Sequence, residues 1–142
     1  MSPTTARDRT DVVLVDWLGR GGIAQTSAAW SVELRKGNIP HVIVTRRGRE
    51  LSANSGTLSV PPGRSKIATH SALARGAAAV IRELRPRTVV VQNYVIPPLE
   101  RPVYEAASAV GARTVMVAHD MTLPSRLSGT HIGLSCILRA TD

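Results

Sequence analysis

Three glycines within four positions could bring a phosphate close to the main chain. Gly19, Gly21 and Gly22 follow an apolar run, residues 12–15, and precede a segment with helical spacing. Because glycine has no Cβ, the main chain can turn tightly there and lie against a ligand. A helix that begins at such a turn directs its first N–H groups and its positive dipole end outward, which favours an anion. The six-residue dinucleotide fingerprint is absent, so a purely structural tight turn is the alternative.

A histidine at the end of a later apolar run is the second candidate for chemistry. His119 and Asp120 directly follow residues 114–118, which have the composition of a strand. The carboxyl ends of parallel strands share one edge of a sheet, so we expect His119 on the same edge as the glycine turn. An imidazole there can donate to a phosphate or exchange a proton near neutral pH. A hydrogen-bonded structural histidine is the alternative.

Polar side chains also follow a third apolar run. Gln92, Asn93 and Tyr94 come at or just after the end of residues 88–92. Residues at this point of a parallel strand line the ligand crevice of α/β proteins. We therefore expect these three side chains to line the same cleft.

The remaining histidines and the cysteine have no metal-ligand spacing. His41 opens a strand at the opposite edge, His70 precedes a helix and His131 lies in the C-terminal segment, so we assign them structural or surface roles. The single cysteine, Cys136, excludes an internal disulfide and resembles a small buried apolar residue. We expect no metal site and no cofactor.

The elements that position these groups alternate between strands and helices. Strands are expected at residues 11–17, 41–45, 57–60, 88–92 and 114–118, and helices at residues 23–36, 71–84, 97–111 and 132–139. This alternation predicts an α/β fold, a Rossmann-like parallel sheet flanked by helices with right-handed crossovers.

Three local features refine this arrangement. The first helix should place Ile23, Ser27, Trp30 and Leu34 on one inward face, and should stop at Gly37-Asn38, where glycine takes the left-handed conformation. Residues 46–66 form a long connection, for which variable surface is favoured over a binding rim. Residues 1–10 are expected to be a disordered leader, and residues 11–142 one domain.

Charge is the strongest compositional signal. The formal net charge is +8, and Lys36 and Lys66 are the only lysines among 18 basic residues, with a dense patch at Arg46, Arg47 and Arg49. Few aromatics accompany these charges, which argues against nucleic acid. Phosphorylated or acidic partners, including an anionic membrane surface, remain open. The polar N-terminus and the lack of a long apolar run predict a cytoplasmic protein, for which a membrane-peripheral location is the alternative.

A series of motifs in a particular order carries a family resemblance. They are the Gly-Gly-Ile turn, the Gly-Asn helix end, Val-Ile-Val-Thr, Ile-Arg-Glu-Leu-Arg-Pro, Val-Val-Val and Val-Met-Val-Ala-His-Asp. From about Asp11 onward, the chain resembles the N-terminal domain of a family 4-type glycosyltransferase, one half of the GT-B architecture. The C-terminal domain of that family, with its nucleotide pocket and paired glutamates, has no counterpart in this sequence.

The resemblance implies roles for the candidate residues. The turn containing Gly19, Gly21 and Gly22 would lie near the diphosphate of a nucleotide diphosphate sugar donor. His119, with Asp120 beside it, would be the catalytic pair in the cleft between the domains. The resemblance implies sugar transfer to an unknown acceptor, with retention of configuration favoured, and an isolated fragment without activity.

Two other classes of function stay open. A noncatalytic Rossmann-like module that binds a phosphorylated ligand would share the turn and need no second domain. A basic protein that binds nucleic acid would lose affinity steeply with salt.

Overall fold

The computed structural model describes residues 10–54, 56–93 and 95–118. In chain order the elements are β1 (Val12–Asp16), α1 (Gly21–Lys36), β2 (His41–Arg46), the short 3-10 helix η1 (Glu50–Ala53), β3 (Thr57–Val60), α2 (Lys66–Leu84), β4 (Thr88–Gln92), α3 (Pro97–Ala109) and β5 (Arg113–Val117). Most of the expected leader and all of the expected helix at residues 132–139 lie outside the described residues.

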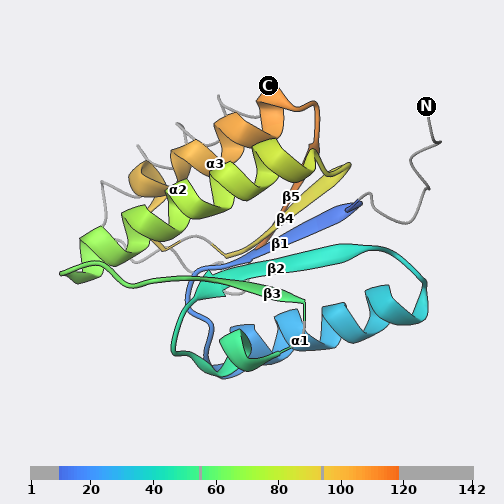
Figure 1. Cartoon of the computed structure of the whole chain (residues 1–142), viewed down its shortest axis with the longest axis horizontal. Helices are drawn as coiled ribbons and strands as arrows, with labels where there is room; N and C mark the ends of the chain where they lie inside the picture. The colour runs from blue at the N-terminus through green and yellow to red at the C-terminus, as the bar shows by residue number, and fades with distance from the viewer. Residues whose placement is uncertain (1–9, 55, 94, 119–142) are drawn as a thin grey trace, which may run out of the picture.

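The five strands form one sheet in the order β3-β2-β1-β4-β5 (Figure 1). All four neighbouring pairs are parallel, which confirms the Rossmann-like α/β prediction. The chain runs outward from β1 to β2 and β3, and then returns through α2 to β4 on the other side of β1. Ligands of such sheets bind outside the carboxyl ends of the strands where this reversal occurs. Here that point lies between β1 and β4.

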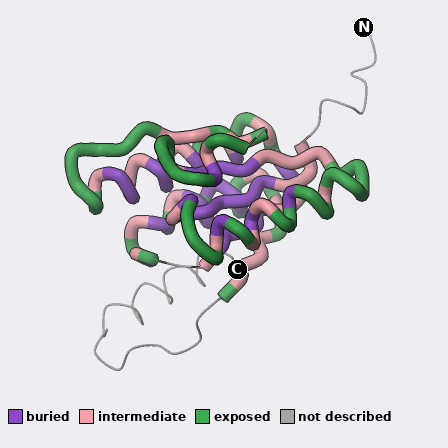
Figure 2. The backbone as a smooth tube through the Cα atoms, turned by 90° about the horizontal axis from the view of Figure 1, so that it is seen from below, coloured by how far each residue is buried: buried purple, intermediate pink, exposed green. Residues whose placement is uncertain are grey.

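Helices cover both faces of the sheet. α1 lies on one face, and α2 and α3 lie together on the other (Figure 1). Successive strand residues point to opposite faces, so Val13 and Val15 pack in the larger core with α2 and α3, whereas Leu14 packs in a smaller core on the α1 side. Figure 2 shows the buried residues concentrated in the central strands and on the inner helix surfaces. Within the described residues, no helix is both long enough and apolar enough to span a bilayer.

The first helix buries a different set of residues from the one predicted. Its buried residues are Ala24, Ser27 and Ser31, whereas Trp30 is 36% exposed. Two polar anchors favour this rotation: Ser27 binds Asp16 of β1, and Ser31 binds His41 of β2. A purely apolar pattern could not have detected them.

The helix ends at Lys36 as predicted, but the glycine is not the left-handed residue. Gly37 has φ −80°, and the left-handed residue is Asn38, with φ 53°. Asparagine tolerates this conformation better than most residues, so it makes the turn in place of glycine.

The second helix begins at Lys66, five residues before its expected start. Ser65 is the N-cap, and its Oγ accepts from the Ala68 N–H at 3.1 Å, a common way to start a helix. His70 therefore lies inside α2 and is fully buried, not before the helix. The strands at residues 57–60 and 88–92 were predicted with their observed bounds.

The connection between β2 and α2 follows a defined course against the sheet. It contains η1 and β3, and its Leu51 side chain is only 2% exposed. β3 adds a parallel strand at the edge of the sheet. Part of this segment therefore belongs to the core, while its remaining residues surround the end of β2.

Candidate functional site

Asp16, the last residue of β1, fixes the glycine turn. Its side chain is buried; Oδ1 accepts from the N–H groups of Leu18 and Gly19 at 3.0 and 2.7 Å, and Oδ2 accepts from Ser27 Oγ at 2.7 Å. One carboxylate thus joins the end of a strand, the turn and the helix that follows. The turn is held in one shape before any ligand arrives.

Gly19 is required by the packing of the protein itself. It is buried, its φ is +62°, and a Cβ there would lie 2.6 Å from Thr45 Oγ1 and 3.0 Å from Arg49 Cβ. Its carbonyl accepts from the Leu51 N–H at 3.1 Å. The turn is therefore clamped against the end of β2 and against η1.

Gly21 and Gly22 have open space around them. Both are exposed, and a Cβ at either position would meet no atom of the described residues within 4 Å. The N-cap residue Arg20 makes no side-chain capping bond, and the first turn of α1 has no acidic residue. Since the first N–H groups of a helix have no partners inside it, this end of α1 can accept an anion.

The end of β4 lies beside this turn. Gln92 pairs with Asp16 of β1 and Val117 of β5 in the last register position of the sheet, and it is only 1% exposed. Asn93 has φ 63°; its N–H donates to the Val117 carbonyl at 2.7 Å, and its carbonyl accepts from Trp17 Nε1 at 3.1 Å. The backbone of Asn93 therefore ties together the ends of three strands.

Three of the predicted site residues lie outside the described residues: Tyr94, His119 and Asp120. β5 ends at Val117, two residues before His119. The roles assigned to these three residues stay predictions.

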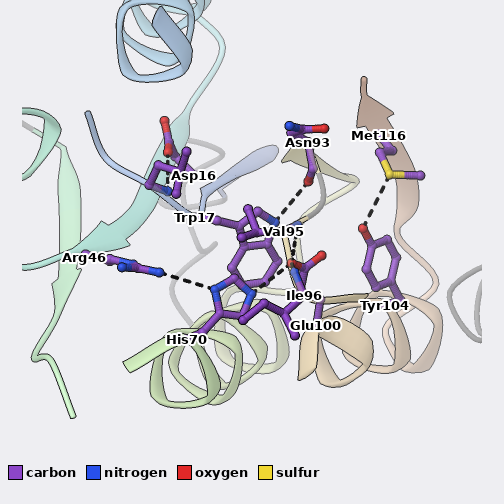
Figure 3. A network of polar contacts seen from close by, with 11 residues as sticks. Asp16, Trp17, Arg46, His70, Asn93, Val95, Ile96, Glu100, Tyr104 and Met116 are labelled. Carbon is purple, nitrogen blue, oxygen red and sulfur yellow. Dashed lines mark hydrogen bonds and ion pairs between the residues drawn. The ribbon is translucent and has the colours of Figure 1, made fainter. Parts of the chain in front are cut away.

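A buried polar cluster joins Trp17, which follows β1, to His70 of α2 and Glu100 of α3 (Figure 3). His70 Nε2 and Glu100 Oε1 are 2.9 Å apart, and both side chains are fully buried. Glu100 Oε1 also accepts from the N–H groups of Val95 and Ile96, at 2.7 Å each. The Trp17 ring stacks on the His70 ring, with centroids 4.8 Å apart and an interplanar angle of 30°.

Arg46 determines the proton position on His70. Its Nη2 lies 3.4 Å from His70 Nδ1. A guanidinium can only donate, so Nδ1 is the acceptor and the imidazole proton is on Nε2, where it binds Glu100. Burial, together with the charge of Glu100, raises the pKa of the nearby Tyr104 phenol.

Sequence reasoning missed this cluster, although a signal was present. His70 has helical spacing with Leu73 and Ala77, so it lies on the apolar stripe of α2. Glu100 has the same relation to Val103 in α3. Polar residues on two apolar stripes that pack together are expected to pair, because each needs a partner when buried.

The described residues contain no group of three histidine, cysteine or acidic residues that could hold a metal ion. The site is therefore a glycine turn at a helix N-terminus, at the reversal point of a parallel sheet. Together the fold and the site define a Rossmann-like α/β domain of the kind found in GT-B-like architectures.

Comparisons with known proteins support this class. No family model matches the chain, and no curated protein is significantly similar to it. Among solved structures, the chain resembles a protein of Listeria monocytogenes assigned as a UDP-N-acetylglucosamine 2-epimerase, with a TM-score of 0.60 and 12% identity. The match covers 94% of this chain and 38% of that one. At this identity the likeness shows a GT-B-like fold and does not distinguish family 4.

Proposed function

We propose that this chain is the N-terminal, acceptor-side domain of a glycosyltransferase that uses a nucleotide diphosphate sugar. The observation that carries the proposal is the open glycine turn at the reversal point of a sheet whose fold is GT-B-like. The chain spans 38% of the similar structure, which is consistent with one domain of a two-domain enzyme.

The proposal gives the glycine turn the donor diphosphate. The N–H groups at the start of α1, next to Gly21 and Gly22, would bind phosphate oxygens, because no described atom lies within 4 Å of a Cβ added at either glycine and Arg20 makes no side-chain capping bond. Asp16 would keep these groups in place during the reaction. The electrostatic benefit comes from donors that are already oriented before charge develops on the leaving diphosphate.

The remaining candidates would act on the acceptor side. We assign His119 the task of orienting or protonating an oxygen in the cleft, with Asp120 beside it. Gln92, Asn93 and Tyr94 would line the acceptor side, and the nucleotide would be held by a second domain. With the acceptor on one domain and the nucleotide on the other, fast transfer requires both domains, since each orients one of the two substrates.

Nucleotide-sugar epimerisation is the second candidate, because the similar structure is assigned that reaction. Transfer consumes an acceptor and releases a nucleoside diphosphate, whereas epimerisation changes the sugar of the nucleotide sugar and needs no acceptor. The two products therefore distinguish the reactions.

The test begins with the coding sequence after Asp142, which the proposal predicts to encode a second domain. The extended protein should release nucleoside diphosphate from one of a panel of nucleotide sugars only when an acceptor is present, and the 142-residue chain should not. In the extended protein, Gly22→Val should lower kcat/KM for the donor by about ten- to a hundredfold by displacing the diphosphate.

Ala29→Val is the matched control for this substitution. It places the same β-branched side chain at an exposed position of α1, away from the turn, and should leave the kinetics unchanged. Equal kinetics for Gly22→Val and the wild type would contradict the role of the turn. Acceptor-independent formation of an epimer would replace transfer with the second candidate.

A further inference from the structure

A cavity of about 510 Å³ lies at the carboxyl ends of β2 and β3, beside the start of α2. Its described lining is dominated by basic residues and contains no acidic or aromatic one: Arg46, Arg47, Gly48, Arg49, Pro62, Gly63, Arg64, Ser65, Lys66 and Thr69. We refer to it as the cationic cavity. The function proposed above leaves it without a role.

Among the described residues, no acidic side chain pairs with these charges. In the described part of the chain, the ion pairs formed by Lys36, Arg87 and Arg101 all lie elsewhere, and none involves a basic residue of the cationic cavity. The Arg46 side chain has its hydrogen bond with the His70 ring, not with an acidic residue, among the described side chains. Burial, and then the charges of Arg49 and Arg20, lower the pKa of the Arg46 guanidinium. These cations are close enough to repel one another, and a bound anion would offset that repulsion.

The walls of the cationic cavity are fixed by local packing. A Cβ at Gly63 would lie 2.8 Å from the backbone and side chain of Ala68, so the loop rests directly on the first turn of α2. Thr69 Oγ1 accepts from the Gly63 N–H at 3.0 Å, and the Arg47 N–H donates to the Val60 carbonyl at 2.8 Å. The loop, the strand end and the helix start are thus held together.

The start of α2 adds to the attraction for an anion. Ser65 and Lys66, the cap and the first residue of this 19-residue helix, both line the cationic cavity. The positive end of the helix dipole therefore acts in the same direction as the side-chain charges. Arginine forks match the geometry of phosphate oxygens and bind them with two hydrogen bonds.

Size and composition select the class of ligand. The volume falls within the range of small-molecule pockets. A site for single-stranded nucleic acid would need aromatic side chains for base stacking, and the lining has none. A phosphomonoester carries between one and two negative charges near neutral pH, which suits several adjacent cations.

We propose that the cationic cavity binds the phosphate of a phosphomonoester, carried either by a small soluble metabolite or by a lipid headgroup. Binding requires only this domain, and it stands whether or not the glycine turn serves sugar transfer. The cavity lies on the same edge of the sheet as that turn, so the two sites could be occupied together.

Calorimetry on the 142-residue chain tests the proposal, with glucose 6-phosphate as the soluble probe and glucose as its uncharged control. Glucose 6-phosphate should bind and glucose should not. The double variant Arg64→Gln, Lys66→Gln should weaken binding about tenfold or more, because it removes two charge-assisted contacts. The matched double variant Arg75→Gln, Arg82→Gln removes the same charge from exposed positions of α2 outside the cavity, and should bind like the wild type.

Vesicles distinguish the two sources of the phosphate. The wild type is tested for binding to phosphatidylcholine vesicles that contain phosphatidic acid. If it binds, and the cavity variant loses this binding while the matched variant keeps it, the site is assigned to a lipid headgroup. Binding of the soluble probe alone would assign it to a metabolite. Three results would overturn the proposal. They are an equal loss of phosphomonoester binding in both double variants, no binding of either phosphomonoester to the wild type, and tighter binding of an oligonucleotide that depends on the cavity. Circular dichroism spectra of both variants verify that each is folded.

Discussion

The buried cluster around His70 and the cationic cavity share Arg46, but of the two only the cluster contains an acidic side chain among the described residues. Glu100 Oε1 pairs with His70 Nε2 and accepts from two backbone N–H groups, whereas its buried Oε2 has no hydrogen-bond partner among the described residues. In the cavity, four arginines and Lys66 have no acidic partner among the described residues. A polar group that the chain satisfies itself serves the fold, whereas an accumulated charge of one sign at a cavity indicates a ligand.

The largest expected effect is the loss of stability when the acceptor of the buried His70 cluster is removed. Glu100→Ala should lower the free energy of unfolding by about 3–5 kcal/mol, because it leaves the buried His70 side chain and the N–H groups of Val95 and Ile96 without their acceptor. Glu100→Gln should lose less, since the amide oxygen can replace Oε1. Urea unfolding followed by circular dichroism gives these values.

Glu105→Ala is the control on the same helix. Glu105 pairs with Arg101 at 2.6 Å, and both side chains are about half exposed, so its loss should change stability by less than about 0.5 kcal/mol. If Glu100→Ala were as mild as this control, the cluster would not contribute to the fold in the manner described.

A smaller effect on stability should distinguish Gly19, which the packing of the turn requires, from Gly22, which lies in open space. Gly19→Ala should cost about 1–3 kcal/mol, because it combines a positive φ with contacts of 2.6 and 3.0 Å to Thr45 and Arg49. Gly22→Ala should be neutral or stabilise by up to about 1 kcal/mol, since it adds a helix-favouring residue in open space. Thermal unfolding of the two variants gives the comparison. Equal destabilisation would mean that position 22 is also needed for packing and is not available to a ligand.

The smallest effect concerns the unbalanced charges. Arg64→Gln should leave stability unchanged or raise it by up to about 0.5 kcal/mol at low salt, because it relieves repulsion around the cationic cavity. Any gain should disappear as salt screens the charges. Arg101→Gln, which breaks the exposed pair with Glu105, should instead cost a few tenths of a kcal/mol. A clear loss of stability in Arg64→Gln would show that the protein itself uses this charge.

The strands and the glycine turn could be predicted because their signals are local. Four apolar residues before a cluster of glycines specify a buried strand and a tight turn without reference to the rest of the chain. The same holds for residues 57–60 and 88–92, whose bounds were predicted as observed. Parallel pairing then follows from the alternation of strands with helices.

The rotation of α1 and the partner of His70 could not be predicted in this way. The expected face of α1 included Ser27, but Ser31 turns inward in place of Trp30 because it meets His41. Helical spacing puts His70 on the apolar stripe of α2, but it does not specify the residue that His70 meets, which is Glu100, 30 residues away in sequence. Hydrophobic periodicity carries no information about partners that become neighbours only after the helices pack.

By itself, the sequence determined the order of the elements, the parallel sheet and the anion-favouring turn, because each follows from residues adjacent in the chain. Only the tertiary structure decided which polar and charged side chains come together. It placed His70 against Glu100 inside the protein, and gathered Arg46 and Arg49 with Arg64 and Lys66 around one cavity. Coulomb interactions depend on distance in space, and that distance is fixed only when β2, β3 and α2 come together.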